Sequence, residues 1–190
     1  MSVTVPIIER LSVDQVRALG NCGKYKQYCE MVTSYLEGRC VFCDPLGPLN
    51  KVVRENDLWR MWPNPFPFKN TNPHFVLAPK RHVEGTAQIT RDDMAAMGDL
   101  FLWACTEYAL PGGGLVMRFG SPEYHAGTVL HAHANLMVPD LKGEVRPPLS
   151  KDHGEFAEGI ARIPIFEKLR SGTTFEELPH EEWMLVQGRV

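Results

Sequence analysis

Apolar residues recur at helical spacing in the first part of the chain. Residues 12–37 are expected to form two helices, with Ser12 as the first cap and Gly20 between the helices. A longer helix is predicted after Thr90, whose side chain can cap its start, and it should end before the glycines at 112–114. The apolar stripe of this helix is expected to comprise Met94, Met97, Phe101, Ala104, Cys105 and Tyr108.

Short apolar runs bounded by turn residues predict strands. Asn56 and Asp57 separate two such runs, which indicates a hairpin made from residues 51–55 and 58–62. A proline-rich loop follows. Further strands are expected at 75–78, 115–119 and 129–138.

These elements predict an α+β fold, in which a mostly antiparallel sheet has one long helix packed on it. N-terminal helices precede the sheet and a C-terminal helical extension follows it, with its periodicity interrupted at Pro164. We therefore expect a helical segment over residues 1–39, a main domain over 40–140 and an extension over 141–190.

The composition is that of an ordinary globular protein, with 44% hydrophobic and 23% charged residues in 190. A net charge of −3 argues against a nucleic-acid partner. No apolar run approaches the ~18–20 residues that span a bilayer, so no membrane partner is expected. The first residues lack the apolar core of a signal peptide, and five cysteines do not suggest a disulfide framework. We expect a cytoplasmic protein.

The segment from His131 to Asn135 alternates polar and small residues. If it is a strand, His131, His133 and Asn135 share one face, because side chains alternate between the faces of a sheet. Three polar side chains in a row on an apolar strand are costly unless something polar covers them. Taken alone, the pattern fits a satisfied polar strip about as well as a functional site.

Cys40 and Cys43 form a second candidate site. Two thiolates at this spacing can bind one tetrahedral Zn²⁺ at ~2.3 Å, but they also fit a redox pair or two buried thiols. No second Cys-x-x-Cys follows, so any zinc would need histidine ligands. His82 lies at a strand end where it could turn toward a neighbour, although a lone histidine there is more often a surface residue.

Two loops carry further polar candidates. Asn64 lies among prolines and phenylalanines, where its amide could bind a sugar hydroxyl or only form a turn. The loop that contains Ser121, Gly127 and Thr128 could present backbone N–H groups and hydroxyls to an anion. By itself this loop is more simply interpreted as a connection.

Together these segments resemble the histidine triad (HIT) superfamily over residues 40–139. The motifs occur in the same order: Cys-x-x-Cys, an Asn-containing Pro/Phe loop, His-φ-φ-φ-x-Pro-Lys-x-His, a long helix, a glycine-containing loop, and His-φ-His-φ-(polar)-φ-φ. The resemblance implies a nucleotide-binding domain that hydrolyses or transfers at the α-phosphate. It also implies a homodimer formed through the long helix and a sheet edge.

The resemblance assigns a role to each candidate. His133 falls on the nucleophile that forms a nucleotidyl–imidazole intermediate, His131 on the first triad histidine, and His74 on an additional active-site histidine. Asn64 falls where the ribose is contacted and Thr128 where the phosphate is contacted, with Gly127 and Ser121 in the same loop. The zinc-bearing branches, which include galactose-1-phosphate uridylyltransferase, imply a structural Zn²⁺ held by Cys40, Cys43, His82 and His131.

Two positions depart from the pattern of the family. The third triad position is Asn135, and Gly127-Thr128 stands where many members have Gln-Ser/Thr after a glycine. Both departures concern the leaving group more than nucleotide binding. The leading hypothesis is a zinc-containing nucleotidyl hydrolase or transferase, and the alternative is a nucleotide-binding or sensing module with little turnover. A purely structural zinc domain ranks last because it leaves His133 without a role.

Overall fold

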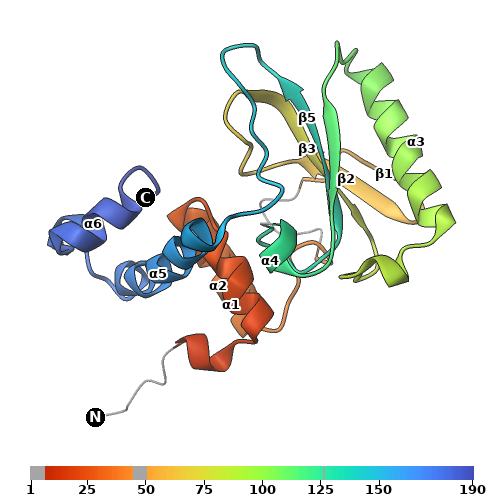
Figure 1. The fold of residues 1–190 in the computed structure, drawn as a ribbon. Coiled ribbons are helices and arrows are strands. Elements are labelled where there is room, and N and C mark those ends of the chain that lie inside the picture. The colour runs from red at the N-terminus through yellow and green to blue at the C-terminus, as the bar shows by residue number, and fades with distance from the viewer. Residues whose placement is uncertain (1–6, 45–50, 126) are drawn as a thin grey trace. The chain divides into compact units, whose positions relative to one another are not determined.

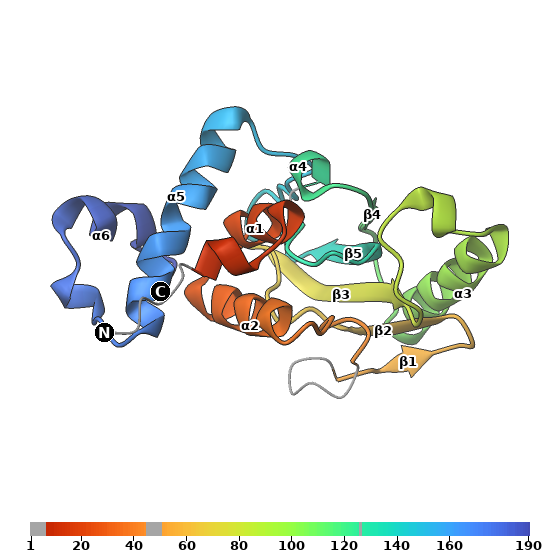
Figure 2. The ribbon, with the colours of Figure 1, turned by 90° about the horizontal axis from the view of Figure 1, so that it is seen from below.

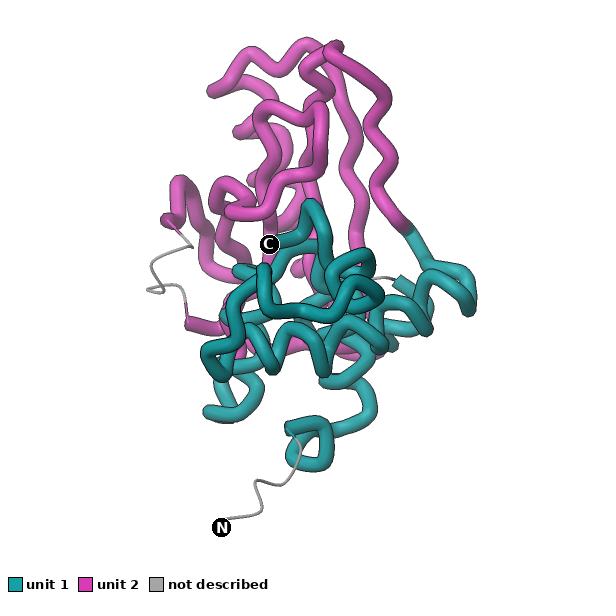
Figure 3. The backbone as a smooth tube through the Cα atoms, turned by 90° about the vertical axis from the view of Figure 1, so that its left-hand side faces the viewer, with its two compact units in different colours: residues 1–39, 121–130, 149–190 teal, residues 40–120, 131–148 magenta. Residues whose placement is uncertain are grey.

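The computed structural model describes residues 7–44, 51–125 and 127–190 (Figure 1). Two compact units make up the chain, and Figure 3 colours them separately. Unit 1 contains residues 1–39, 121–130 and 149–190, and unit 2 contains residues 40–120 and 131–148. The N-terminal helices and the helical extension therefore belong to one unit, together with the segment 121–130 that was expected in the main domain.

Unit 2 is built on a five-stranded sheet with the strand order β1-β2-β3-β5-β4. Every neighbouring pair of strands is antiparallel, which confirms the expected α+β architecture with an antiparallel sheet. The strands are β1 (Arg54–Glu55), β2 (Trp59–Pro63), β3 (Thr71–Pro79), β4 (Gly114–Arg118) and β5 (His133–Pro139).

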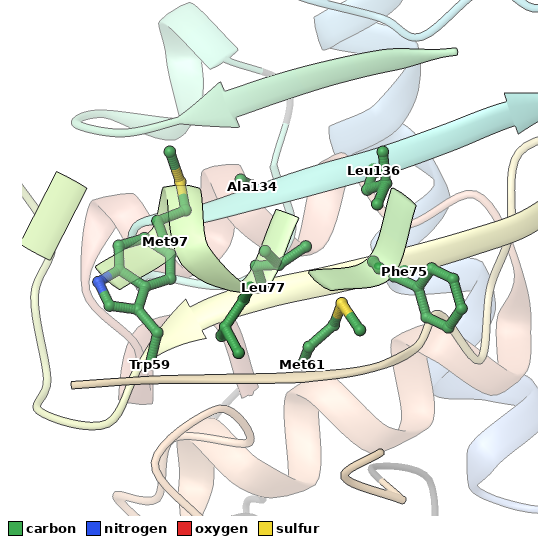
Figure 4. Packing of buried hydrophobic residues seen from close by; sticks show 9 residues of the cluster. Trp59, Met61, Phe75, Leu77, Met97, Ala134 and Leu136 are labelled. Atoms are coloured by element: carbon green, nitrogen blue, oxygen red, sulfur yellow. The ribbon is translucent and has the colours of Figure 1, made fainter. Parts of the chain in front are cut away.

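One face of the sheet packs against the long helix α3 (Arg91–Glu107), and a 3-10 turn, η2 (Thr86–Gln88), precedes this helix. Met61, Leu77 and Ala134 are paired across the strands and project from the same face toward the helix. Figure 4 shows this core, whose buried residues are Trp59, Met61, Phe75, Leu77, Met97, Leu100, Ala104, Ala134 and Leu136. The alternate residues of each strand therefore project from the opposite face.

Helix α3 begins where the sequence predicts, because Thr90 accepts a hydrogen bond from the backbone N–H of Asp93. The predicted apolar stripe is only partly right. Met97 and Ala104 are buried as expected, but Met94 is 42% exposed. Asp93 is buried instead of Met94, because the Asp93 carboxylate accepts hydrogen bonds from Thr90 and pairs with Arg81. Leu100, which was not in the predicted stripe, is also buried.

Unit 1 is helical. Its helices are α1 (Val13–Gly20), α2 (Tyr25–Leu36), α4 (Pro122–His125), α5 (His153–Arg170) and α6 (His180–Val186), with 3-10 turns η1 (Ile7–Arg10) and η3 (Phe175–Glu177). Figure 2 shows α1, α2 and α5 from a second direction. Ser12 caps α1 as predicted. The predicted interruption at Pro164 is wrong: α5 continues through it, and the residues on both sides of this proline, Ile163 and Ile165, are buried.

Strand β5 begins at His133, four residues later than predicted. His131 lies before the strand, and the backbone N–H of Ala132 donates to the carbonyl of Val83 at 2.6 Å. The expectation that His131 shares a strand face with His133 and Asn135 is therefore wrong, and His131 turns to a different set of neighbours.

No helix in the described ranges is both long enough and apolar enough to cross a membrane. All five cysteines fall within those ranges, and none of them forms a disulfide bond there.

Candidate functional site: a Cys–His metal cluster beside a buried histidine

Four side chains from three parts of unit 2 converge at one end of the sheet. Cys40 and Cys43 come from the segment before β1, His82 from the segment after β3, and His131 from the residues before β5. One ligand atom from each side chain lies within 4.8 Å of all the others.

The separations within this cluster fit a tetrahedral metal site. The Sγ atom of Cys40 lies 3.4 Å from Nδ1 of His131. The Sγ atom of Cys43 lies 3.3 Å from Nδ1 of His82 and 3.5 Å from Nδ1 of His131. A zinc tetrahedron with bonds of ~2.3 Å to sulfur and ~2.0 Å to nitrogen has sulfur–nitrogen edges of about 3.5 Å. The donor set and its spacing are therefore compatible with Zn²⁺.

The second nitrogen of each histidine is held by the protein. Nε2 of His131 contacts the carbonyl oxygen of Pro79 at 3.1 Å, and Nε2 of His82 contacts a carboxylate oxygen of Glu84 at 3.1 Å. Such partners place the hydrogen on Nε2 and direct the Nδ1 lone pair toward a metal. Burial lowers the pKa of His131 to about 4, so the ring is neutral and able to act as a ligand.

The Cys43 thiol needs a cation to become a thiolate. Burial and the neighbouring Cys40 raise the pKa of the Cys43 thiol to about 12. A bound Zn²⁺ favours the thiolate and displaces the proton. The cluster is thus a set of ligands whose charge a divalent ion would balance.

His133, the first residue of β5, is buried with 6% of its surface exposed. Its Nδ1 lies 2.8 Å from the carbonyl oxygen of His131, which can only accept a hydrogen bond. The hydrogen of the neutral ring therefore lies on Nδ1, and the lone pair lies on Nε2. Phe42 lies between Cys40 and Cys43 in the sequence. Its ring packs edge-on against the ring of His133, with centroids 5.1 Å apart.

His74 and Asn135 form a second polar pair on this face. Nδ1 of His74 accepts a hydrogen bond from the backbone N–H of Phe68 at 3.1 Å, so the ring hydrogen lies on Nε2. Nε2 then donates to Oδ1 of Asn135 at 3.0 Å. Burial, and to a lesser degree Arg118, lowers the pKa of His74 against the opposing effect of the hydrogen bond to Asn135, and so favours the neutral ring.

Asn64 approaches the same histidine from the end of β2. Its Oδ1 accepts a hydrogen bond from the backbone N–H of Phe66 at 2.8 Å, which fixes the orientation of the amide. Its Nδ2 lies 3.1 Å from Nε2 of His74. Because His74 Nε2 already carries a hydrogen, this contact joins two donors and leaves the amide hydrogens of Asn64 for another acceptor.

The predicted nucleotide-binding residues Ser121, Gly127 and Thr128, of which Thr128 was expected to contact the phosphate, belong to unit 1. The backbone N–H of Gly127 donates to Nδ1 of His125 at 2.9 Å, so it is already used within the unit. The hydroxyl of Thr128 accepts a hydrogen bond from Gln27 at 3.2 Å and retains its own hydrogen. The hydroxyl of Ser121 accepts from the backbone N–H of Glu123 at 3.4 Å.

Two buried arginines were missed by the sequence analysis. Arg60 on β2 is 8% exposed and Arg118 on β4 is 7% exposed. Both occupy strand positions whose side chains project away from the α3 core, on the same face as His133. A charged residue among apolar strand neighbours, as in Trp59-Arg60-Met61, is the signal that could have identified them.

Comparison with known proteins gives structural similarity only. No family model matches the chain. No curated protein matches it either. Histidine triad proteins recur among the solved structures that are similar to it.

Three of these structures show the extent of the similarity. A Zn-bound histidine triad family protein from Mycobacterium smegmatis is 21% identical over 70% of this chain and 97% of its own, with a TM-score of 0.44. A HIT family hydrolase from Legionella pneumophila is 22% identical over 58% of this chain and 100% of its own, also with a TM-score of 0.44. A histidine triad nucleotide-binding protein from Candida albicans is 17% identical over 70% of this chain and 99% of its own, with a TM-score of 0.43.

Proposed function

We propose that this protein is a nucleotidyl hydrolase or transferase that acts at the α-phosphate of a nucleoside 5′-phosphate derivative, such as a dinucleoside polyphosphate. The observation that carries the proposal is the hydrogen bond from Nδ1 of His133 to the carbonyl of His131. In the neutral form of the imidazole this bond places the hydrogen on Nδ1 and the lone pair on Nε2, and that form of the ring is the nucleophilic one.

The reaction then has two displacements. Nε2 of His133 attacks the α-phosphorus, a phosphorus–nitrogen bond forms, and the bond from phosphorus to the leaving oxygen breaks. The modified ring is cationic, and its Nδ1–H still donates to the carbonyl of His131. Water, or another phosphate in a transfer reaction, attacks the same phosphorus, and the phosphorus–nitrogen bond breaks with its electron pair returning to Nε2. When water attacks, one of its protons passes to solvent, and the nucleoside monophosphate is released.

The metal cluster has a structural role in this proposal. All four positions of a zinc tetrahedron are taken by Cys40, Cys43, His82 and His131, so no position remains for an activated water. When bound, the ion would hold His131, whose carbonyl sets the tautomer of His133. It would also hold the loop that places Phe42 against the His133 ring. The cluster would therefore orient the nucleophile without taking part in the chemistry.

Polar groups of the candidate residues support a nucleotide as the ligand. The amide of Asn64 is fixed by Phe66 with its hydrogens directed away from that partner, as an amide that binds a ribose hydroxyl requires. Thr128 retains a hydroxyl hydrogen that can be donated to a phosphate oxygen. His74 is a positioning residue in this proposal, because it acts through Asn135.

A second candidate function is nucleotide binding or sensing with weak turnover or none. Asn135 favours it, because an amide does not change its protonation state near neutral pH and cannot protonate a leaving oxygen. The use of the Gly127 N–H by His125 also removes one backbone donor from any contact with an anion.

Incubation of the metal-loaded protein with adenosine and guanosine polyphosphates distinguishes the two functions. We expect chromatography to show the nucleoside monophosphate as a product. Binding of the same nucleotides without release of monophosphate would contradict the proposed enzyme and support the binding module.

A further inference from the structure

Two side chains that lie next to His133 on its face of the sheet keep buried N–H groups that have no hydrogen-bond acceptor among the described residues. They are Nδ2 of Asn135 and Nε of Arg118. Asn135 is 4% exposed and Arg118 is 7% exposed, so solvent does not supply the missing acceptor. Buried donors are almost always paired in folded proteins, and each exception requires a physical account.

Both donors are placed next to His133 by the register of the sheet. Arg118 on β4 lies directly opposite His133 on β5, which brings their Cβ atoms to about 5 Å in an antiparallel pair. Asn135 lies two residues further along β5 and projects from the same face.

The contacts of Arg118 show how its side chain lies on this face. Its Cζ atom lies 5.4 Å from the centre of the Phe68 ring, and Nη2 donates to the carbonyl of Pro148 at 2.8 Å. The Phe68 ring packs in turn on His74, with centroids 5.1 Å apart. Arg118 is thus held by one hydrogen bond and one aromatic ring, and no carboxylate pairs with it among the ion pairs of the described chain.

The orientation of the Asn135 amide is fixed as well. Its Oδ1 accepts the Nε2 hydrogen of His74, so the Nδ2 hydrogens must point away from that ring. The Asn135 amide and the Arg118 guanidinium are thus two oriented hydrogen-bond donors beside the ring of His133. Neither has a negatively charged acceptor among the described residues. Phosphoryl oxygens match these two donors, because arginine and amide N–H groups both donate to them and the guanidinium offsets their charge.

We propose that Arg118 and Asn135 bind the phosphoryl group that His133 attacks, and that Arg118 makes the site selective for nucleosides that carry a phosphate. This inference rests on the proposed function in that the ligand is a nucleoside phosphate. Arg118 on β4 supplies a permanent positive charge, and Asn135, at the third position of the histidine triad pattern, supplies a neutral hydrogen bond.

Arg60 is a separate case. It also has buried N–H groups without partners in the described part of the chain, but its charge acts on Cys43 and His131. Arg60 therefore belongs to the surroundings of the metal cluster, and the selectivity is assigned to Arg118 alone.

The test compares the binding of AMP and adenosine to the metal-loaded protein by calorimetry. Wild type should bind AMP more tightly than adenosine. Arg118→Met should weaken AMP binding by about 10- to 100-fold, the range of one charge-assisted hydrogen bond, and change adenosine binding less than about twofold. Arg118→Lys keeps the charge but loses Nε, so it should give an intermediate AMP affinity. Arg54→Met is the matched control, because Arg54 also stacks on an aromatic ring, at 5.2 Å from Trp103, yet lies on β1.

Two results would overturn the inference. One is a wild-type protein that binds adenosine as tightly as AMP. The other is a variant that loses affinity for both ligands by the same factor, which indicates a structural role. If Arg118→Met does not fold, the ratio of AMP to adenosine affinity in Arg118→Lys decides, and an unchanged ratio contradicts the inference. The experiment measures binding and not turnover. A protein without turnover would therefore contradict the proposed reaction, whereas the affinities for AMP and adenosine would still decide the role of Arg118.

Discussion

His133 donates its Nδ1 hydrogen to the backbone carbonyl of His131 at 2.8 Å, and His131 directs its own Nδ1 into the Cys–His cluster. One residue therefore belongs to the metal cluster through its side chain and sets the tautomer of the proposed nucleophile through its main chain. This arrangement links the integrity of the cluster to the chemistry that we propose for His133.

The cluster should hold one zinc ion per chain. Elemental analysis of protein purified without chelator is expected to give a stoichiometric ratio, because four suitable ligand atoms lie within 4.8 Å of one another. Cys43→Ser should lose the metal and melt at a lower temperature, since metal binding contributes to folding. Cys105→Ser is the control, because Cys105 lies on α3 outside the cluster. Protein that contains no stoichiometric metal would disprove the zinc assignment.

Acid should destabilise the protein partly through His74. Its pKa is lowered in the folded state, mainly by burial, so below about pH 6.5 the unfolded chain binds more protons at this ring than the folded chain. The contribution of the neutral ring to the free energy of unfolding is therefore complete above about pH 6.5 and is lost as the pH falls through the lowered pKa.

Urea unfolding of wild type and His74→Gln at about pH 7 and about pH 5.5 measures this contribution. The stability advantage of wild type over the variant should shrink at the lower pH. An advantage that stays constant or grows in acid would contradict the lowered pKa.

Asn135 should limit the range of leaving groups. General acid catalysis contributes about 10²–10⁴ in rate, and an amide cannot supply it. We expect turnover of substrates whose leaving group is a polyphosphate or sugar phosphate, and poor turnover where a strongly basic amine or alkoxide departs. Asn135→His should improve the second class selectively, as measured by kcat/KM across leaving groups of different pKa. Equal effects on both classes would show that Asn135 is not the cause of the limit.

The long helix is proposed to form a homodimer interface. Leu102 on α3 is 62% exposed although it is apolar, as expected of a residue that a second copy covers. Leu102→Glu should convert a dimer to a monomer in light scattering coupled to gel filtration. Val13→Glu, at an apolar residue of α1 that is 67% exposed, is the matched control and should leave the dimer intact. A monomeric wild type would refute this proposal.

The sequence predicted the elements that depend on local signals. Ser12 and Thr90 cap helices where expected, and the hairpin around Asn56 forms because the Asn56 side chain accepts hydrogen bonds from the next turn. The apolar stripe of α3 was predicted wrongly in part because this helix carries apolar residues on more than one side, such as the exposed Leu102. In addition, a tertiary contact to Arg81 buries Asp93. Local pattern does not reveal such a contact.

The candidate site also has parts that the sequence could predict and parts that depend on long-range contacts. The resemblance implied the four candidate metal ligands, and the structure brings all four together. The Arg118–His133 pairing depends on the register between β4 and β5, which no single segment encodes. Long-range packing likewise decides that the loop with Ser121, Gly127 and Thr128 belongs to unit 1. Asn21, the C-cap of α1, donates a side-chain hydrogen bond to the carbonyl of Gly127.

Detection of a nucleotidyl–His133 adduct is the most direct test of the central claim. Mass spectrometry of wild type, quenched during turnover and digested, should show one nucleotidyl group on the peptide that contains His133. His133→Ala should show no adduct and no turnover, whereas His180→Ala, at an exposed histidine of α6, should behave like wild type. If His133→Ala lowered the rate only about tenfold, equal to ~1.4 kcal/mol of barrier, and no adduct formed in wild type, His133 would not be a covalent nucleophile.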